Sequence, residues 1–146
     1  MKIALAADHA GFAFKEKLAA ELLRLGHEPI DFGTLSSESC DYPDFAIPAA
    51  QSVSDGKAQR GILLCTNGIG MCMVANRVPH VRGALVYSAR TAEMTRRHHD
   101  SNVLCLGAGE FPAETLLEWV RRWLETPFEG GRHERRIGKL EALERK

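Results

Sequence analysis

A cysteine followed by a glycine-rich turn is the feature of this sequence that offers the most chemistry. Cys65-Thr66-Asn67 runs into Gly68-Ile69-Gly70-Met71 directly after an apolar segment. A glycine-rich turn between a strand and a helix presents consecutive backbone amides, which bind phosphate or enolate oxygens. A thiol at such a position can have a lowered pKa and act as a nucleophile or a base. The segment lacks the Gly-Lys-Ser/Thr ending of a Walker loop. The plain alternative is a tight turn, with Cys65 as a buried residue at the strand end.

Two more groups of polar residues stand beside predicted strands. Asp8-His9 closes the first apolar segment, where it would contact a ligand or cap the following helix. His98-His99-Asp100 precedes the last predicted strand, where histidines serve as acid/base groups or simply favour the negative end of a helix dipole. No third ligand stands at a suitable spacing from these histidines, and the cysteines match no zinc pattern. We therefore expect no metal.

Positive charge is concentrated near the C-terminus, in Arg132-His133 and Arg135-Arg136. Arg132 and Arg136 are four residues apart, so one face of a helix presents both guanidinium groups. Such a pair can clamp a phosphate group. The alternative is that these residues form a solvated helix face. Judged from the charge pattern alone, this alternative is favoured over the phosphate clamp.

Alternating strand and helix patterns must position these groups. Short apolar segments predict strands at residues 3–7, 27–32, 61–64, 81–87 and 102–106. Helical patterns predict helices at residues 11–25, 43–55, 89–97, 112–124 and about 131–146, the last with Ile137, Leu140 and Leu143 on one face. A further helix holds Met71, Val74 and Ala75, and we expect Met71, Cys72 and Met73 to pack in the core. This alternation predicts an α/β fold, a three-layer Rossmann-like sandwich with a five-stranded parallel sheet and helices on both faces.

Ligands of such sheets bind at the carboxyl ends of the strands. Asp8-His9 and Cys65 would lie at that edge, together with Ser88, Arg90 and the turn after the last strand. His98-His99-Asp100 would lie at the opposite edge of the same sheet, because it precedes its strand. Only a second copy of the chain could bring these histidines to the site.

The composition is that of one globular domain spanning residues 1–146. The chain is 45% hydrophobic and 26% charged, and its 19 basic residues balance 19 acidic ones. A net charge of zero argues against a broad surface for nucleic acid or membrane lipid, and no apolar run approaches the roughly 20 residues that span a bilayer. The N-terminal residues predict a strand rather than a signal peptide, so we expect a cytoplasmic protein with reduced thiols.

Taken in order, the motifs resemble ribose-5-phosphate isomerase type B and the wider family that includes galactose-6-phosphate isomerase subunits. The resemblance is carried by Asp8-His9-Ala10-Gly11-Phe12, Asp31-Phe32-Gly33-Thr34, Asp41-Tyr42-Pro43, Cys65 with Gly68-Ile69-Gly70-Met71, Ala75-Asn76-Arg77, His98-x-Asp100-x-Asn102-Val103-Leu104 and Glu129-Gly130-Gly131-Arg132-His133. Each motif is modest, but the ordered set covers nearly the whole chain and is specific.

The resemblance implies an aldose–ketose isomerase that interconverts ribose 5-phosphate and ribulose 5-phosphate through an enediolate. It implies no metal or organic cofactor. It also implies a homodimer, or a dimer of dimers, with active sites at the interface and the C-terminal helix reaching the partner.

The resemblance further implies a role for each candidate residue. Cys65 matches the base that moves the proton, and His98 matches the acid/base group that opens the sugar ring. Asn67 stands where the family has the hydroxyl that polarises the carbonyl. The implied contacts to sugar, phosphate and oxyanion are Asp8, His9, the amides of Gly68, Ile69, Gly70 and Met71, and Arg132 and Arg136 of the partner.

Three positions depart from the family pattern. Thr66-Asn67 replaces Gly-Thr or Gly-Ser, His99 replaces an asparagine, and Gly109 replaces an arginine. These changes leave open a related sugar phosphate as the substrate, with His99 as a further contact. They also leave open a noncatalytic module that binds a phosphorylated metabolite. A flavodoxin-type nucleotide domain is a weaker alternative, because no Gly-x-Gly-x-x-Gly follows the first strand.

Overall fold

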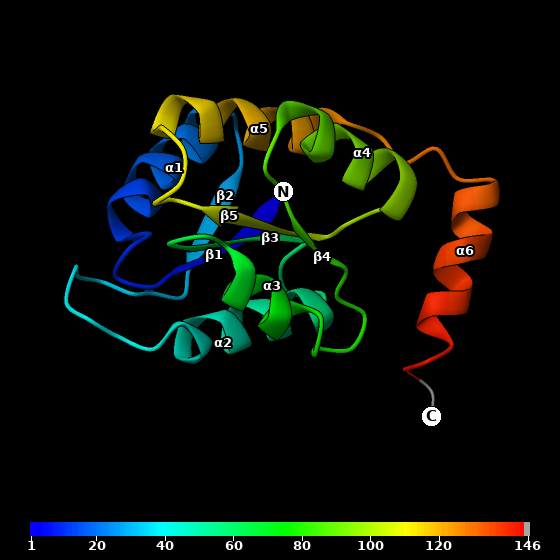
Figure 1. Ribbon diagram of the computed structural model, residues 1–146, viewed down its shortest axis with the longest axis horizontal. Helices are drawn as coiled ribbons and strands as arrows, with labels where there is room; N and C mark the ends of the chain where they lie inside the picture. The colour runs from blue at the N-terminus through cyan, green and yellow to red at the C-terminus, as the bar shows by residue number, and fades with distance from the viewer. Residues whose placement is uncertain (145–146) are drawn as a thin grey trace.

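Five short apolar segments form one parallel sheet in the computed structural model, which describes residues 1–144 (Figure 1). The strands are β1 (Lys2–Ala7), β2 (Glu28–Asp31), β3 (Arg60–Cys65), β4 (Gly83–Leu85) and β5 (Val103–Gly107). Their spatial order is β2-β1-β3-β5-β4, and all four pairings are parallel. The central strands β1, β3 and β5 are buried almost without interruption, because helices cover both faces of the sheet.

Helices form the two outer layers. The helices α1 (Phe12–Arg24), α4 (Ala89–His99) and α5 (Ala113–Glu125) cover one face, and α2 (Tyr42–Ser54) and α3 (Ile69–Ala75) cover the other (Figure 1). Each face has its own apolar core: Trp123 of α5 and Leu18 of α1 are fully buried in the first, and Met71 of α3 is fully buried in the second. The predicted α/β sandwich is therefore confirmed.

Several element boundaries differ from the prediction, each for a local reason. Helix α2 begins one residue earlier than expected and, as the predicted range implies, continues through Pro48, whose exposed position lets water solvate the carbonyl group that loses its partner. Helix α4 extends to His99 and ends where Asp100 adopts a left-handed conformation. Pro112 precedes α5 as its N-cap instead of opening it. Met73 was expected to pack in the core, but it lies on the outer face of α3 and is 54% exposed.

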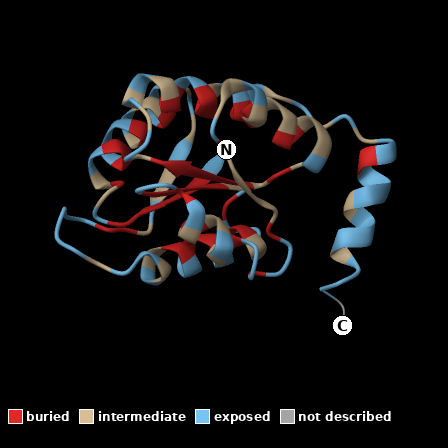
Figure 2. Ribbon diagram, viewed as in Figure 1, coloured by how far each residue is buried: buried red, intermediate tan, exposed pale blue. Residues whose placement is uncertain are grey.

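The last helix, α6 (Arg132–Glu141), stands apart from the three layers and packs against α4 (Figure 1). It is exposed along most of its length, with His133 as its buried residue (Figure 2). Leu140 projects from it into solvent, and Leu143, expected on the same helical face, follows the end of the helix. The expected helix extended to residue 146, and residues 145–146 lie outside the described part. None of the helices in residues 1–144 has the length and apolarity to cross a bilayer.

Candidate active site

Cys65 ends β3 and is followed by the turn that begins α3. Its side chain is 5% exposed, and its Sγ atom accepts a hydrogen bond from the Gly68 amide at 3.1 Å. Gly68 makes this contact with a left-handed φ of 79°. A Cβ atom at Gly68 would lie 2.9 Å from the backbone carbon of Leu106, so only glycine fits without displacement. The turn therefore brings a backbone N–H directly to the sulfur.

The first turn of α3 still has backbone donors available. The Ile69 amide donates to Asn67 Oδ1 at 3.1 Å. The amides of Gly70 and Met71 donate to no acceptor within residues 1–144, as is usual for the first turn of a helix. The Tyr42 ring packs against Gly70, where a Cβ atom would come within 2.7 Å of it. Asn67 thus keeps its side-chain NH₂ group as a donor, next to two open amides.

The loops after β1, β3 and β5 are bound to one another at the carboxyl edge. The Asp8 amide donates to the Leu64 carbonyl at 3.1 Å, and the Ala108 amide donates to the Cys65 carbonyl at 2.8 Å. Gly109, one of the three departures, donates to the Thr66 carbonyl at 2.9 Å. A Cβ atom at Gly109 would lie 3.0 Å from Thr66 Cγ2, so the unusual residues 66 and 109 are packing neighbours.

Asp8 and His9 lie at this same edge, as the sequence indicated. Asp8 is buried and accepts hydrogen bonds from the amides of Ala10 and Gly11 at 3.0 and 3.3 Å, so it stabilises the turn that precedes α1. The exposed His9 ring accepts a hydrogen bond at Nδ1 from the Cys40 amide at 3.2 Å. This contact ties the loop before α2 to the site, and Cys40 was not expected to take part.

Two further cysteines lie under the turn. Cys105 of β5 is completely buried, which raises the pKa of its thiol well above the usual range. A hydrogen bond from Cys105 lowers the pKa of the half-buried Cys72 thiol to about 7. The contact with Cys105 therefore stabilises negative charge on the Cys72 sulfur.

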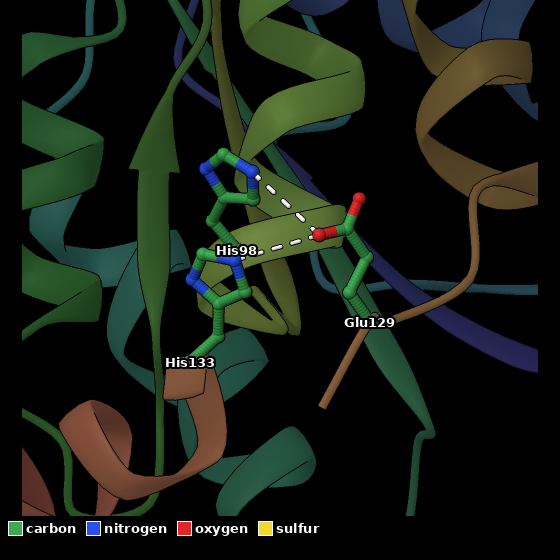
Figure 3. Close-up of side chains that lie close together, drawn as sticks. All are labelled: His98, Glu129 and His133. Carbon is green, nitrogen blue, oxygen red and sulfur yellow. Dashed lines mark ion pairs between the residues drawn. The ribbon is translucent and has the colours of Figure 1, made fainter. Parts of the chain in front are cut away.

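His98 belongs to a different cluster, in the last turn of α4. Its ring stacks on that of His133 of α6, with centroids 4.1 Å apart and planes at 11°. Glu129, in the loop before α6, places Oε2 3.8 Å from His98 Nε2 and 3.4 Å from His133 Nε2 (Figure 3). The hydrogen bond from Arg97 lowers the pKa of the Glu129 carboxyl. Burial, followed by the charges of His98 and Arg132, lowers the pKa of His133.

The other predicted residues of this region surround the cluster. His99 and Arg136 line the same cavity as His98 and His133, a space of about 160 Å³. Arg132 and Arg136 are exposed on α6, as the expected clamp requires. Asp100 is not available as a ligand, because it pairs with Arg82 and Arg96 at 3.0 and 2.8 Å.

The structure does not bring Cys65 and His98 together within one chain. Cys65 pairs with Gly107 at the carboxyl end of β5, and His98 precedes Val103 at the other end of that strand. Four residue steps along a strand separate these levels by roughly 13 Å. One chain therefore has a thiol half-site and an imidazole–arginine half-site at opposite edges, as the sequence predicted.

The role of Glu129 and Tyr42 was missed by reasoning from the residues. Both stand in motifs that carried the resemblance, Asp41-Tyr42-Pro43 and Glu129-Gly130-Gly131, so the sequence did mark them. The sequence did not indicate where these residues lie. In the structure Tyr42 packs against the turn after Cys65, and Glu129 lies beside the two imidazole rings.

Comparisons with known proteins identify the family of this chain. The family described as Ribose/Galactose Isomerase matches residues 3–140. Ribose-5-phosphate isomerase B of Escherichia coli is 38% identical to this chain, over 99% of the chain and 97% of the relative. The solved structure of ribose-5-phosphate isomerase B from Clostridium thermocellum superposes with a TM-score of 0.97 at 41% identity, covering 99% of this chain and 98% of the other.

A second solved structure contains a sugar phosphate. Ribose-5-phosphate isomerase B from Mycoplasma genitalium with bound ribulose-5-phosphate superposes with a TM-score of 0.96 at 37% identity, covering 99% of this chain and 97% of the other. Matches of this extent span nearly the whole chain. The chain therefore belongs to the ribose/galactose isomerase family.

Proposed function

We propose that this sugar-phosphate isomerase interconverts ribose 5-phosphate and ribulose 5-phosphate, with Cys65 as the base and an enediolate as the intermediate. The observation that carries the proposal is the Gly68 amide at 3.1 Å from Cys65 Sγ, beside a turn whose next amides are open. The substrate is supported by relatives that act on ribose 5-phosphate, one of which holds ribulose-5-phosphate. A noncatalytic binding module is not favoured, because the relatives are enzymes.

The chemistry explains why these groups belong together. A proton next to a carbonyl group is weakly acidic, so its removal requires donors that stabilise the oxyanion left behind. One well-placed donor contributes about 3–4 kcal/mol to the transition state. The Gly70 and Met71 amides and the Asn67 NH₂ group are such donors. Cys65 Sγ takes the proton from C2 as the electrons of that C–H bond form the C1–C2 double bond and the carbonyl pair moves onto O1. The thiol then returns the proton to C1 as the O2 hydroxyl becomes the carbonyl and its proton passes to O1.

The second half-site completes the reaction from a partner subunit. We propose a homodimer in which His98 opens the sugar ring and Arg132 and Arg136 bind the phosphate group. In a two-fold assembly each chain supplies the thiol half of one site and the imidazole half of the other. This arrangement is supported by the distance between the two halves in one chain and by the exposed Leu140 on α6. Phosphate binding far from C1 and C2 then supplies energy that holds the carbonyl in place.

A direct assay tests the activity. Purified protein is supplied with ribose 5-phosphate or a hexose 6-phosphate in deuterated solvent, and both ketose formation and deuterium incorporation are followed. We expect isomerisation of ribose 5-phosphate with exchange at C1 or C2, and its loss in Cys65→Ala. Folded protein that isomerises none of the sugars would refute the proposal. Full turnover in Cys65→Ala would refute the role of the thiol alone.

Complementation tests the shared site. Cys65→Ala and His98→Gln are each expected to be inactive, but chains of the two variants that exchange form mixed dimers with one intact site. Random exchange should restore about a quarter of the wild-type activity, since half of the dimers are mixed and each has one intact site of two. Sites built within single chains would give no recovery at all.

A further inference from the structure

The stacked histidines and the carboxylate beside them have the ligand types of a transition-metal site. His98 Nε2, His133 Nε2 and Glu129 Oε2 all lie within 4.8 Å of one another (Figure 3). Two imidazoles and one carboxylate form a common set of protein ligands for zinc with an open fourth position. The sequence did not indicate this set, because Glu129 and His133 lie about 30 residues beyond His98 and join it through the packing of α6 on α4.

A buried polar atom without a hydrogen bond is the second observation. His133 is 5% exposed, and its Nε2 atom is the only buried side-chain nitrogen or oxygen in residues 1–144 that makes no hydrogen bond. A polar group left in this state costs free energy, so such an atom calls for an explanation. A metal ion bound at this nitrogen would give it a partner. That nitrogen faces Glu129 and lies beside the Nε2 atom of His98 (Figure 3).

The carboxylate is already oriented by a neighbour. Arg97 Nε donates to Glu129 Oε1 at 2.5 Å, and the Glu129 amide donates to the Arg97 carbonyl at 3.1 Å. The pair fixes the side chain and leaves Oε2 directed at both imidazoles. Partners of this kind, which hold a ligand in place from behind, typically support metal sites.

The distances suit a small tetrahedral ion. Bonds of about 2.0–2.1 Å from zinc to nitrogen or oxygen place neighbouring ligand atoms about 3.4 Å apart. The His133–Glu129 separation of 3.4 Å already has this value, whereas the His98 ring must tilt out of its stack on His133 to direct Nε2 at the same ion. The adjoining cavity of about 160 Å³ has room for a water molecule as the fourth ligand.

The surrounding charge sets the strength of binding. Arg132 and Arg136 lie on the same helix as His133, and Arg97 pairs with Glu129. Their positive charge opposes a cation, so we expect reversible binding that a chelator removes. We propose that His98, Glu129 and His133 bind Zn²⁺ or a similar transition-metal ion, and that the bound ion inhibits the isomerase by withdrawing the His98 imidazole. The inhibitory part rests on the proposed function; the binding part does not.

Cobalt titration of the full-length protein tests the binding. Chelator-treated protein is titrated with Co²⁺, and the visible absorption of a four-coordinate ion is followed until Zn²⁺ displaces it. We expect one ion per chain and at least tenfold weaker binding in His133→Gln, since loss of one of three protein ligands removes a large part of the affinity. His80→Gln is the matched control, because His80 is an exposed histidine in the loop before β4, and it should bind like the wild type.

Two results would overturn the site. One is equal affinity in His133→Gln and His80→Gln. The other is a thiolate-to-cobalt charge-transfer band that disappears in Cys65→Ser or Cys40→Ser, which would place the ion on a cysteine. If His133→Gln does not fold, the same titration is carried out on Glu129→Gln, which changes an exposed side chain. Cobalt affinity equal to that of His80→Gln would then overturn the site.

The activity measurement separates this proposal from the proposed function. Zn²⁺ should inhibit turnover with the same midpoint as it displaces Co²⁺, and excess chelator should restore the rate. Binding at the three residues without inhibition would refute the inhibitory role. An enzyme inactive even without metal would refute the proposed function, while the cobalt titration would still establish or exclude the site.

Discussion

Gly68→Ala should damage both the stability of the fold and the chemistry of the turn, and Gly26→Ala provides a matched comparison. Both glycines have left-handed φ angles, 79° and 82°, so alanine costs about 1–2 kcal/mol at either position. A Cβ atom at Gly26 would meet nothing within 4 Å, whereas one at Gly68 would lie 2.7 Å from Leu85 Cδ1 and 2.9 Å from the Leu106 backbone. Overpacking adds about 1–3 kcal/mol at Gly68, for a total of roughly 2–5 kcal/mol.

Urea unfolding of both variants at one fixed protein concentration measures this difference, since association between chains would itself change the apparent stability. The isomerase rate should fall more than tenfold in Gly68→Ala, because the shifted turn moves its amide away from Cys65 Sγ, and it should be unchanged in Gly26→Ala. Equal free energies of unfolding in the two variants would refute the packing argument. A full rate in a destabilised Gly68→Ala would show that the amide–sulfur contact is not needed.

Three further substitutions test the scaffold by chemical denaturation. Lys15→Met should cost about 2–3 kcal/mol, because it removes a fully buried ammonium group from Asp31, whose side chain is still partly solvated; an unchanged midpoint would mean that the pair contributes nothing net. Trp123→Phe should cost about 2–3 kcal/mol, because the buried indole donates to Ser101 Oγ at 2.8 Å, and the double variant with Ser101→Ala should lose less than the sum of the single changes. Ser88→Ala should cost about 1 kcal/mol through loss of the capping box of α4, and Ser88→Asp should recover most of it.

The carboxyl-edge half of the site could be predicted because it follows from periodicity alone. Once β1 and β3 are parallel neighbours, Asp8 and Cys65 must end at the same edge of the sheet, whatever the details of packing. The opposite position of His98 follows in the same way, since it precedes β5. These inferences need only the order of elements and the direction of the strands, which the apolar segments determine.

The surroundings of His98 could not be predicted, because they depend on a turn rather than on a pattern. Gly130 and Gly131 both have left-handed φ angles, 66° and 59°, and they set the direction in which α6 leaves the domain. That direction places His133 on His98, and no periodicity in a sequence encodes it. The prediction that Met73 packs in the core was wrong for a related reason. Helix α3 has only seven residues, so positions on its exposed face lie directly beside positions on its buried face.

The position of α6 links the two halves of the proposed site to association between two chains. This helix buries little against its own chain, yet it supplies both candidate phosphate ligands, Arg132 and Arg136. In the proposed homodimer, contacts with the partner chain would add to the packing of α6 on α4 and stabilise this short helix. The same contact that orders α6 would bring its arginines, and the neighbouring His98, to a thiol on another copy. In the proposed homodimer, folding of the last helix and completion of the active site would be one event, so that dilution to single chains would abolish the activity.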